Sequence, residues 1–152
     1  MRPLRTAEEP VLSPRNASRS RHWRFWMGLF ELLTGGATGL FTYANFMTLI
    51  GQLHDDSAAG MPLAAIITLA ASFTVVSLAG VITGIWNLAT LRSTDRSPLI
   101  AAIVVSAVSI ILAMVFLSGS PFHPVKIGWA FLHAFYSMWT IRILRLKKVT
   151  AE

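Results

Sequence analysis

A run of 25 residues from Trp26 to Ile50 contains one charged side chain, Glu31, among apolar, small and uncharged polar residues. A helix needs about 20 such residues to cross the hydrocarbon core of a bilayer, which is about 30 Å thick. Three more apolar runs of similar length follow in the sequence. The sequence therefore predicts an all-α integral membrane protein, an up-down bundle of four transmembrane helices.

The boundaries of these helices follow from prolines, polar loops and the ends of the apolar runs. We expect helices at residues 23–50, 62–91, 98–117 and 124–146, within a transmembrane domain that covers residues 23–148. Prolines 62 and 98 suit the first turn of the second and third helices. Residues 1–22 are polar and have no apolar period, so they are predicted to form a disordered basic tail. All connections are short, which favours antiparallel neighbours.

Composition restricts the kind of protein further. Only 13% of the 152 residues are charged, about half the fraction of a soluble domain. The absence of cysteine excludes disulfides, thiolate metal sites and cysteine nucleophiles. The net charge is +6, but the basic residues lie beside the predicted helices. We therefore expect them to meet the headgroups of a lipid bilayer and expect no nucleic-acid partner.

The distribution of basic residues predicts the orientation. Twelve lie in the N-terminal tail, the loop at residues 92–96 and the C-terminal end, whereas the other two loops contain only Lys126. Because basic residues concentrate on the cytoplasmic side, both termini should be cytoplasmic. We expect the protein in the bacterial cytoplasmic (inner) membrane.

Small and polar residues form stripes on the predicted helices. In the first helix they recur every three or four residues, so they share one face, and this face should point into the bundle. Its members are Glu31, Gly35, Thr38, Thr42 and Asn45. A third-helix stripe comprises Ala102, Ser106, Ser109 and Ala113. Two GxxxG pairs, Gly35 with Gly39 and Gly80 with Gly84, are predicted to let helices pack closely.

Glu31 is the main candidate for chemistry. An ionised carboxylate inside a bilayer costs several kcal/mol unless it is paired or hydrated, and such a group can exchange protons. Counting from the helix ends places Asn87 and Thr140 at a matching depth, and we expect Glu31 to bond one or both. The alternative is a structural acid that fixes helix register or stays wet near the interface. The candidate proton or polar site comprises Glu31, Thr38, Thr42, Asn45, Asn87, His133, Tyr136 and Thr140.

His133 lies near the middle of the fourth helix and raises the possibility of a haem or pigment. Paired axial histidines on facing helices would indicate haem, and the first three helices contain none. We predict no cofactor and expect His133 to bond a Thr or Ser across the bundle, such as Thr42 or Thr74.

The two outer loops hold donors suited to Zn²⁺. They are His54, Asp55, Asp56 and His123. Their spacing fits no metal motif, so we predict a solvated acidic loop and no metal site.

Four short helices with a glutamate in the first resemble the small multidrug-resistance transporters. The resemblance covers Phe30-Glu31-Leu32 and the number of helices. Members of that family are shorter, and many have a weak charge bias that suits antiparallel dimers. The strong bias of this chain argues against such a dual topology.

Two functions are consistent with these features. The first is a non-enzymatic accessory, assembly or regulatory subunit that packs against another membrane protein or against itself. The second is a small proton-coupled transporter with Glu31 as the coupling carboxylate. No nucleophile elbow, HExxH motif or phosphate-binding loop is present, so we expect no enzyme. A membrane enzyme that modifies lipids is the third alternative.

Overall fold

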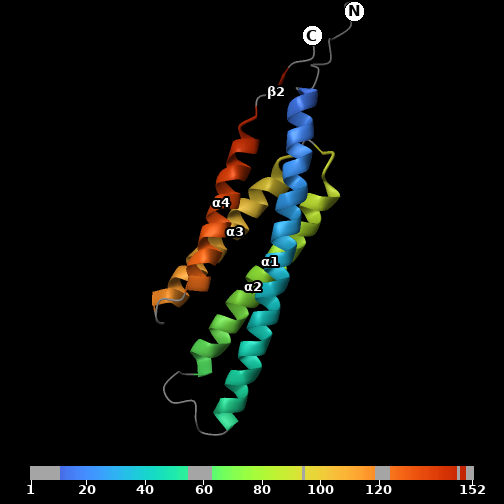
Figure 1. The fold of residues 1–152 in the computed structure, drawn as a ribbon. Coiled ribbons are helices and arrows are strands. Elements are labelled where there is room, and N and C mark those ends of the chain that lie inside the picture. The colour runs from blue at the N-terminus through green and yellow to red at the C-terminus, as the bar shows by residue number, and fades with distance from the viewer. Residues whose placement is uncertain (1–10, 55–62, 94, 119–123, 147, 150–152) are drawn as a thin grey trace, which may run out of the picture.

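The computed structural model describes residues 11–54, 63–93, 95–118, 124–146 and 148–149. The elements, in chain order, are β1 (Val11–Leu12), α1 (Pro14–His54), α2 (Leu63–Ala89), α3 (Ser97–Ser118), α4 (Pro124–Leu144) and β2 (Lys148–Val149). The predicted all-helical fold with four helices is confirmed for this part of the chain (Figure 1). The two short strands were not predicted, and they pair antiparallel with Val11 opposite Val149.

Helix α1 begins nine residues earlier than predicted, so the expectation of a disordered tail is wrong for residues 14–22. The local reason is a cap. Ser13 precedes Pro14, its hydroxyl accepts a hydrogen bond from the backbone N–H of Asn16 at 3.4 Å, and its carbonyl accepts one from Ala17 at 2.8 Å. A serine cap followed by proline is a strong helix start even in a polar sequence. Residues 1–10 lie outside the described residues.

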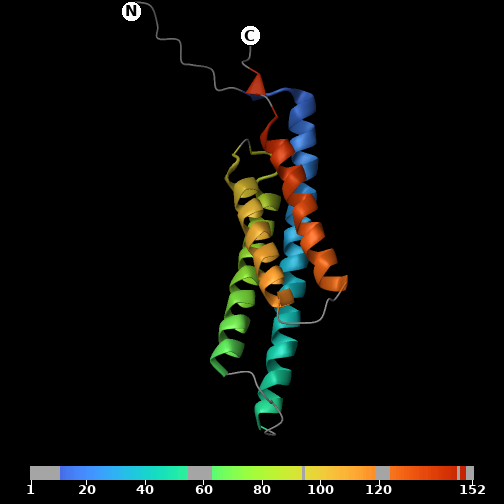
Figure 2. The ribbon, with the colours of Figure 1, turned by 90° about the vertical axis from the view of Figure 1, so that its left-hand side faces the viewer.

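The helices form two antiparallel pairs, α1 with α2 and α3 with α4, which pack together (Figures 1 and 2). With 41 residues, α1 is the longest helix, and at 1.5 Å per residue it is about 60 Å long. The first half of α2 and the second half of α1 extend beyond the ends of α3 and α4 (Figure 2). The first helical residues of α1 and the last of α4 lie at the opposite end.

Glycines bring α1 and α2 into backbone contact. A Cβ atom on Gly35 would lie 2.8 Å from the carbonyl oxygen of Ser77 and 2.8 Å from the amide nitrogen of Val81. A Cβ on Gly84 would lie 2.7 Å from the carbonyl oxygen of Gly28. No side chain larger than hydrogen fits at these distances, so these glycines fix how the two helices meet.

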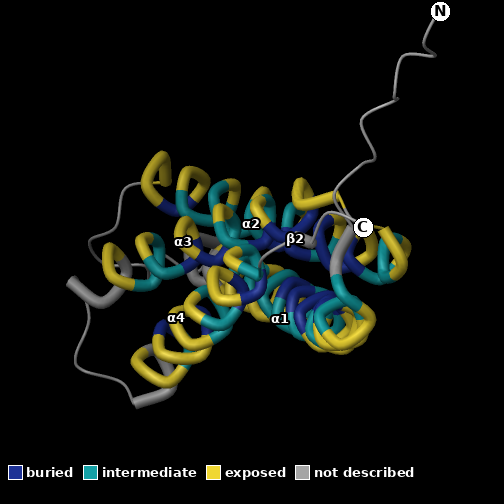
Figure 3. The backbone as a smooth tube through the Cα atoms, turned by 90° about the horizontal axis from the view of Figure 1, so that it is seen from above, coloured by how far each residue is buried: buried dark blue, intermediate teal, exposed yellow. Residues whose placement is uncertain are grey.

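Large apolar side chains cover the outside of the bundle, and the buried positions are concentrated between the helices (Figure 3). Two of the described helices, α2 and the segment of α3 from Ser97 to Val115, are long and apolar enough to cross a membrane. Helices α1 and α4 carry more polar and charged residues, among them Glu31, His133 and Arg142.

Arg24 of α1 forms hydrogen bonds with the corner between α2 and α3, the segment where α2 ends and α3 begins. Its side chain is only 2% exposed. One guanidinium nitrogen donates to the carbonyl oxygen of Thr90 at 3.4 Å, and the other donates to the carbonyl oxygen of Asp95. The Asp95 carboxyl in turn accepts hydrogen bonds from the backbone N–H and the hydroxyl of Ser97. These bonds hold the pKa of Asp95 below its ordinary value.

Replacing Arg24 with methionine is expected to destabilise the protein by about 1–3 kcal/mol, because carbonyl groups at the corner lose a charged donor. Thermal unfolding in detergent or lipid measures the change. Arg21→Met, at an exposed position of the same helix, is the matched control and should change stability little. Equal effects of the two substitutions would show that the corner contacts of Arg24 contribute nothing.

Candidate functional site

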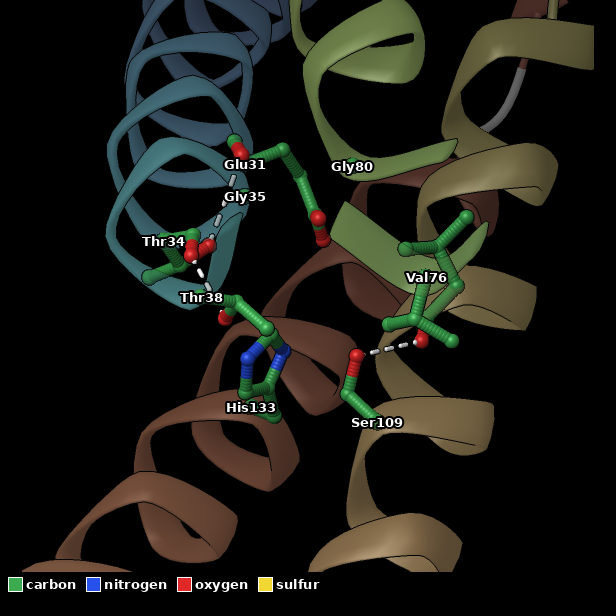
Figure 4. A pocket seen from close by; sticks show the side chains of 9 residues that line it. Glu31, Thr34, Gly35, Thr38, Val76, Gly80, Ser109 and His133 are labelled. Atoms are coloured by element: carbon green, nitrogen blue, oxygen red, sulfur yellow. Dashed lines mark hydrogen bonds between the residues drawn. The ribbon is translucent and has the colours of Figure 1, made fainter. Parts of the chain in front are cut away.

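The carboxyl group of Glu31 lies where all four helices meet, and the residue is only 1% exposed (Figure 4). The hydroxyl of Ser106 on α3 donates to Glu31 Oε1 at 2.8 Å. Gly80 of α2 lies beside the acid: a Cβ there would lie 3.6 Å from Glu31 Oε2, an ordinary van der Waals contact, and 3.3 Å from the Cα atom of Gly35. The glycine contact between α1 and α2 therefore also shapes the place where the carboxyl lies.

His133 of α4 completes the group. Its Nδ1 atom lies 3.2 Å from the hydroxyl oxygen of Ser106, and the residue is 2% exposed. Phe30 and Trp129 pack against the ring, with centroids 5.1 Å and 5.4 Å away. The Nε2 atom is buried and has no hydrogen-bond partner in the described structure. One serine hydroxyl thus joins a carboxyl and an imidazole from different helices.

A small pocket of about 10 Å³, partly open to the outside, lies beside this group. Its lining comes from all four helices: Glu31, Thr34, Gly35, Thr38, Val76, Gly80, Val105, Ser109 and His133 (Figure 4). The hydroxyls of Thr34, Thr38 and Ser109 each donate to a carbonyl of their own helix. Since a hydroxyl has one hydrogen, these three groups can offer only acceptor oxygens to the pocket.

The predicted partners of Glu31 are wrong. Asn87 instead donates to the carbonyl oxygens of Thr83 at 3.1 Å and Pro98 at 3.0 Å, which ties α2 to α3. Thr140 donates to its own helix and accepts a bond from Trp23 at 3.4 Å. Matching depths counted from the helix ends do not give the register of one helix against another. The glycine contact sets the actual register, in which Glu31 lies next to Gly80, seven residues before Asn87.

The residues of the polar stripe of α1 become more exposed toward the C-terminal end of the helix. Thr38 and Thr42 are half-buried, and Asn45 is exposed, contrary to the expectation that the whole stripe faces inward. Each donates to the carbonyl four residues earlier in α1. The reason is the difference in helix length: α3 and α4 do not extend along the last turns of α1 (Figure 2).

Two aromatic residues of α4, Tyr136 and Trp139, pack against α1. Tyr136 stacks on Phe30 with ring centroids 3.8 Å apart, and Trp23 stacks between Tyr136 and Trp139 at 5.8 Å and 5.1 Å. Tyr136 therefore belongs to the contact between α1 and α4.

His133 was predicted to bond a Thr or Ser across the bundle, such as Thr42 or Thr74. It bonds a serine, Ser106, and neither of these threonines. Thr42 and Thr74 bond carbonyls of their own helices.

The weak metal candidates lie almost entirely outside the described residues: this holds for Asp55, Asp56, His123 and the side chain of His54. Within the described ranges, no group of three or more His, Asp or Glu side chains could hold a metal ion.

From the sequence, Ser106 was predicted to pack in a stripe of small residues and was not among the candidate site residues.

The order of the three groups, carboxyl, hydroxyl and imidazole, matters for the chemistry. In a Ser-His-acid triad the imidazole lies between the hydroxyl and the carboxylate, whereas here the hydroxyl lies between the other two. The arrangement is suited to passing a proton and is not that of an activated nucleophile.

Comparison with models of protein families, with curated proteins and with solved structures gave no match for this chain. A proposed function for this chain therefore rests on the geometry of the site.

Proposed function

We propose that all four helices span a membrane, with both termini on the cytoplasmic side. The length and apolar character of α2 and α3 support this, as do the large apolar side chains around the outside of all four helices. Exposed arginines lie at the end of the bundle near the termini, where they suit anionic headgroups. They include Arg15, Arg19, Arg21, Arg142 and Arg145.

Within this bundle, Glu31 carries a proton for proton-coupled transport of a small solute. The observation that supports this most is a buried carboxyl at the junction of four helices, beside a pocket that reaches the outside. The described residues supply no fixed positive charge to it. Helices α2 and α3 contain no ionisable residue. Arg24 is bonded at the α2–α3 corner, and Arg142 lies over Trp139 at 5.5 Å.

A carboxylate without such a counter-charge is costly to bury, and proton uptake removes its charge. The acceptor oxygens in the pocket lining also favour a guest that brings hydrogen-bond donors or positive charge. We therefore infer a small cationic or amine-bearing solute as the substrate class.

The first test is a pH jump applied to vesicles that contain the reconstituted protein, adsorbed on a solid-supported membrane. Proton binding at Glu31 moves charge part of the way into the bilayer, so we expect a transient current without any added solute. Protein-free vesicles give the background. A current from the protein that equals this background would overturn the proposal.

A second function, that of an accessory or assembly subunit, is favoured by the part of the α1–α2 pair that extends beyond α3 and α4. Large apolar side chains there are uncovered, among them Met47, Ile50, Leu63 and Ile67. Mild-detergent extraction from native membranes followed by mass spectrometry tests this function. A stoichiometric membrane-protein partner would support it, and a lone or self-associated chain would leave transport as the better proposal.

A further inference from the structure

The Ser106 hydroxyl has one hydrogen but lies within hydrogen-bond distance of two groups, Glu31 Oε1 at 2.8 Å and His133 Nδ1 at 3.2 Å. It can donate to only one of them at a time. When Glu31 is ionised, its oxygen can only accept, so Ser106 donates to it and Nδ1 of His133 must carry the hydrogen. When Glu31 is protonated and donates to Ser106, the serine donates to Nδ1, and the imidazole hydrogen lies on Nε2.

We propose that Glu31, Ser106 and His133 form a proton relay in which the tautomer of His133 changes each time Glu31 gains or loses its proton. The inference rests on the proposed role of Glu31 as the proton-carrying group. It assigns to Ser106 and His133 a function that packing alone would not require.

The step balances without any other reactant. A hydronium ion gives a proton to His133 Nε2 and becomes water, and the proton on Nδ1 passes to the Ser106 oxygen. The hydroxyl proton of Ser106 passes to Glu31 Oε1 in the same direction. One proton has then been taken up, the carboxylate is neutral, the serine is again a hydroxyl, and the imidazole is neutral with its hydrogen on Nε2. Release of the proton reverses each transfer.

The surroundings of His133 support entry at Nε2. This atom is buried without a partner among the described residues, and the residue lines the pocket that opens beside Glu31. A cavity needs about 10–15 Å³ to hold one water molecule, and this pocket, with about 10 Å³, lies at the lower limit for one. The imidazole remains uncharged before and after the step, which suits a residue that is 2% exposed.

No other ionisable group interrupts the relay in the described helices. Helices α2 and α3 contribute none. From α1 the nearest is Arg24, two turns before Glu31 and bonded at the α2–α3 corner. From α4, Tyr136 stacks on Phe30, and Arg142 lies over Trp139.

The test is ¹⁵N NMR of histidine-labelled full-length protein in lipid bilayers across a pH series, with infrared spectroscopy of Glu31 on the same samples. His133→Gln identifies the His133 signals among the four histidines. We expect the hydrogen on Nδ1 where Glu31 is ionised and on Nε2 where it is protonated, with one common midpoint. A single His133 tautomer across the titration of Glu31, or a Glu31 that does not titrate, would overturn the relay.

Two serine variants test the bridge. Ser106→Ala is expected to remove the common midpoint, because no hydroxyl then connects the two groups. Ser109→Ala is the matched control on the same helix and in the same pocket, since its hydroxyl bonds the carbonyl oxygen of Val105 at 2.9 Å, and it should keep the coupling. Coupling that persists in Ser106→Ala would overturn the relay, and the wild-type titration decides the question if that variant does not fold.

The failure of this inference is distinguishable from failure of the proposed transport function. A pH-jump current that depends on Glu31, together with an unchanged His133 tautomer, overturns the relay alone. A coupled tautomer change in a protein whose liposomes show no proton-linked flux of a cationic probe, such as tetramethylammonium, supports the relay and overturns the transport function.

Discussion

Replacing Glu31 with glutamine is expected to reduce the pH-jump current of the reconstituted protein to the level of protein-free vesicles. Glutamine has nearly the same size, and its side-chain oxygen can still accept the hydrogen bond from Ser106, so the packing at the four-helix junction is retained. It has no group that takes up a proton in this pH range. The loss of current would therefore report the loss of a proton-binding site and not a loss of structure.

Two further variants make this result specific. Glu31→Asp keeps a carboxyl group and should keep a current, while Ser109→Ala alters the same pocket without touching the acid and should leave the current unchanged. Circular dichroism and size-exclusion chromatography establish that each variant is folded. An undiminished current from Glu31→Gln would remove Glu31 as the proton-carrying group.

Two adjacent glycines of α1 should respond in opposite directions to the same substitution. Gly35→Ala places a methyl group 2.8 Å from backbone atoms of Ser77 and Val81. Those atoms belong to a helix and cannot move aside alone, so α1 and α2 must separate, at a cost of about 1–3 kcal/mol. Gly36 has no neighbouring atom within 4 Å of such a methyl group, and Gly36→Ala should stabilise the helix by up to about 1 kcal/mol.

Reversible unfolding in bicelles measures both changes in the free energy of unfolding. The comparison cancels the effect of alanine on the helix itself, which is common to both positions. Equal changes at Gly35 and Gly36 would contradict the close contact of α1 with α2. Loss of this contact should also displace Glu31, because Gly80 of α2 lies beside the acid.

Much of the site could be predicted from spacing, because residues three and four positions apart share a helix face. This periodicity identified Glu31, Gly35 and Gly80, which the structure brings together. It could not give the partners of Glu31, since those depend on how far one helix is shifted along another. That shift is set by the fit of glycines against backbone atoms.

Ser106 and Asn45 show two other limits of periodicity. Ser106 was identified only as part of a small-residue stripe, because a serine that packs and a serine that bridges two groups have the same spacing. Asn45 lies on the predicted inner face, yet it is exposed. A stripe faces a bundle only as far as the neighbouring helices extend, and their relative placement is not encoded in the stripe.

The measurement that tests the proposed site most directly is infrared difference spectroscopy of the protein in lipid while the pH is varied. We predict a carboxyl band that is lost in Glu31→Gln, shifted in frequency in Ser106→Ala and unshifted in Ser109→Ala. Such a result would establish both the proton exchange of Glu31 and its hydrogen bond to Ser106. A spectrum with no Glu31 carboxyl band at any pH, or a band that Ser106→Ala leaves unshifted, would contradict the site.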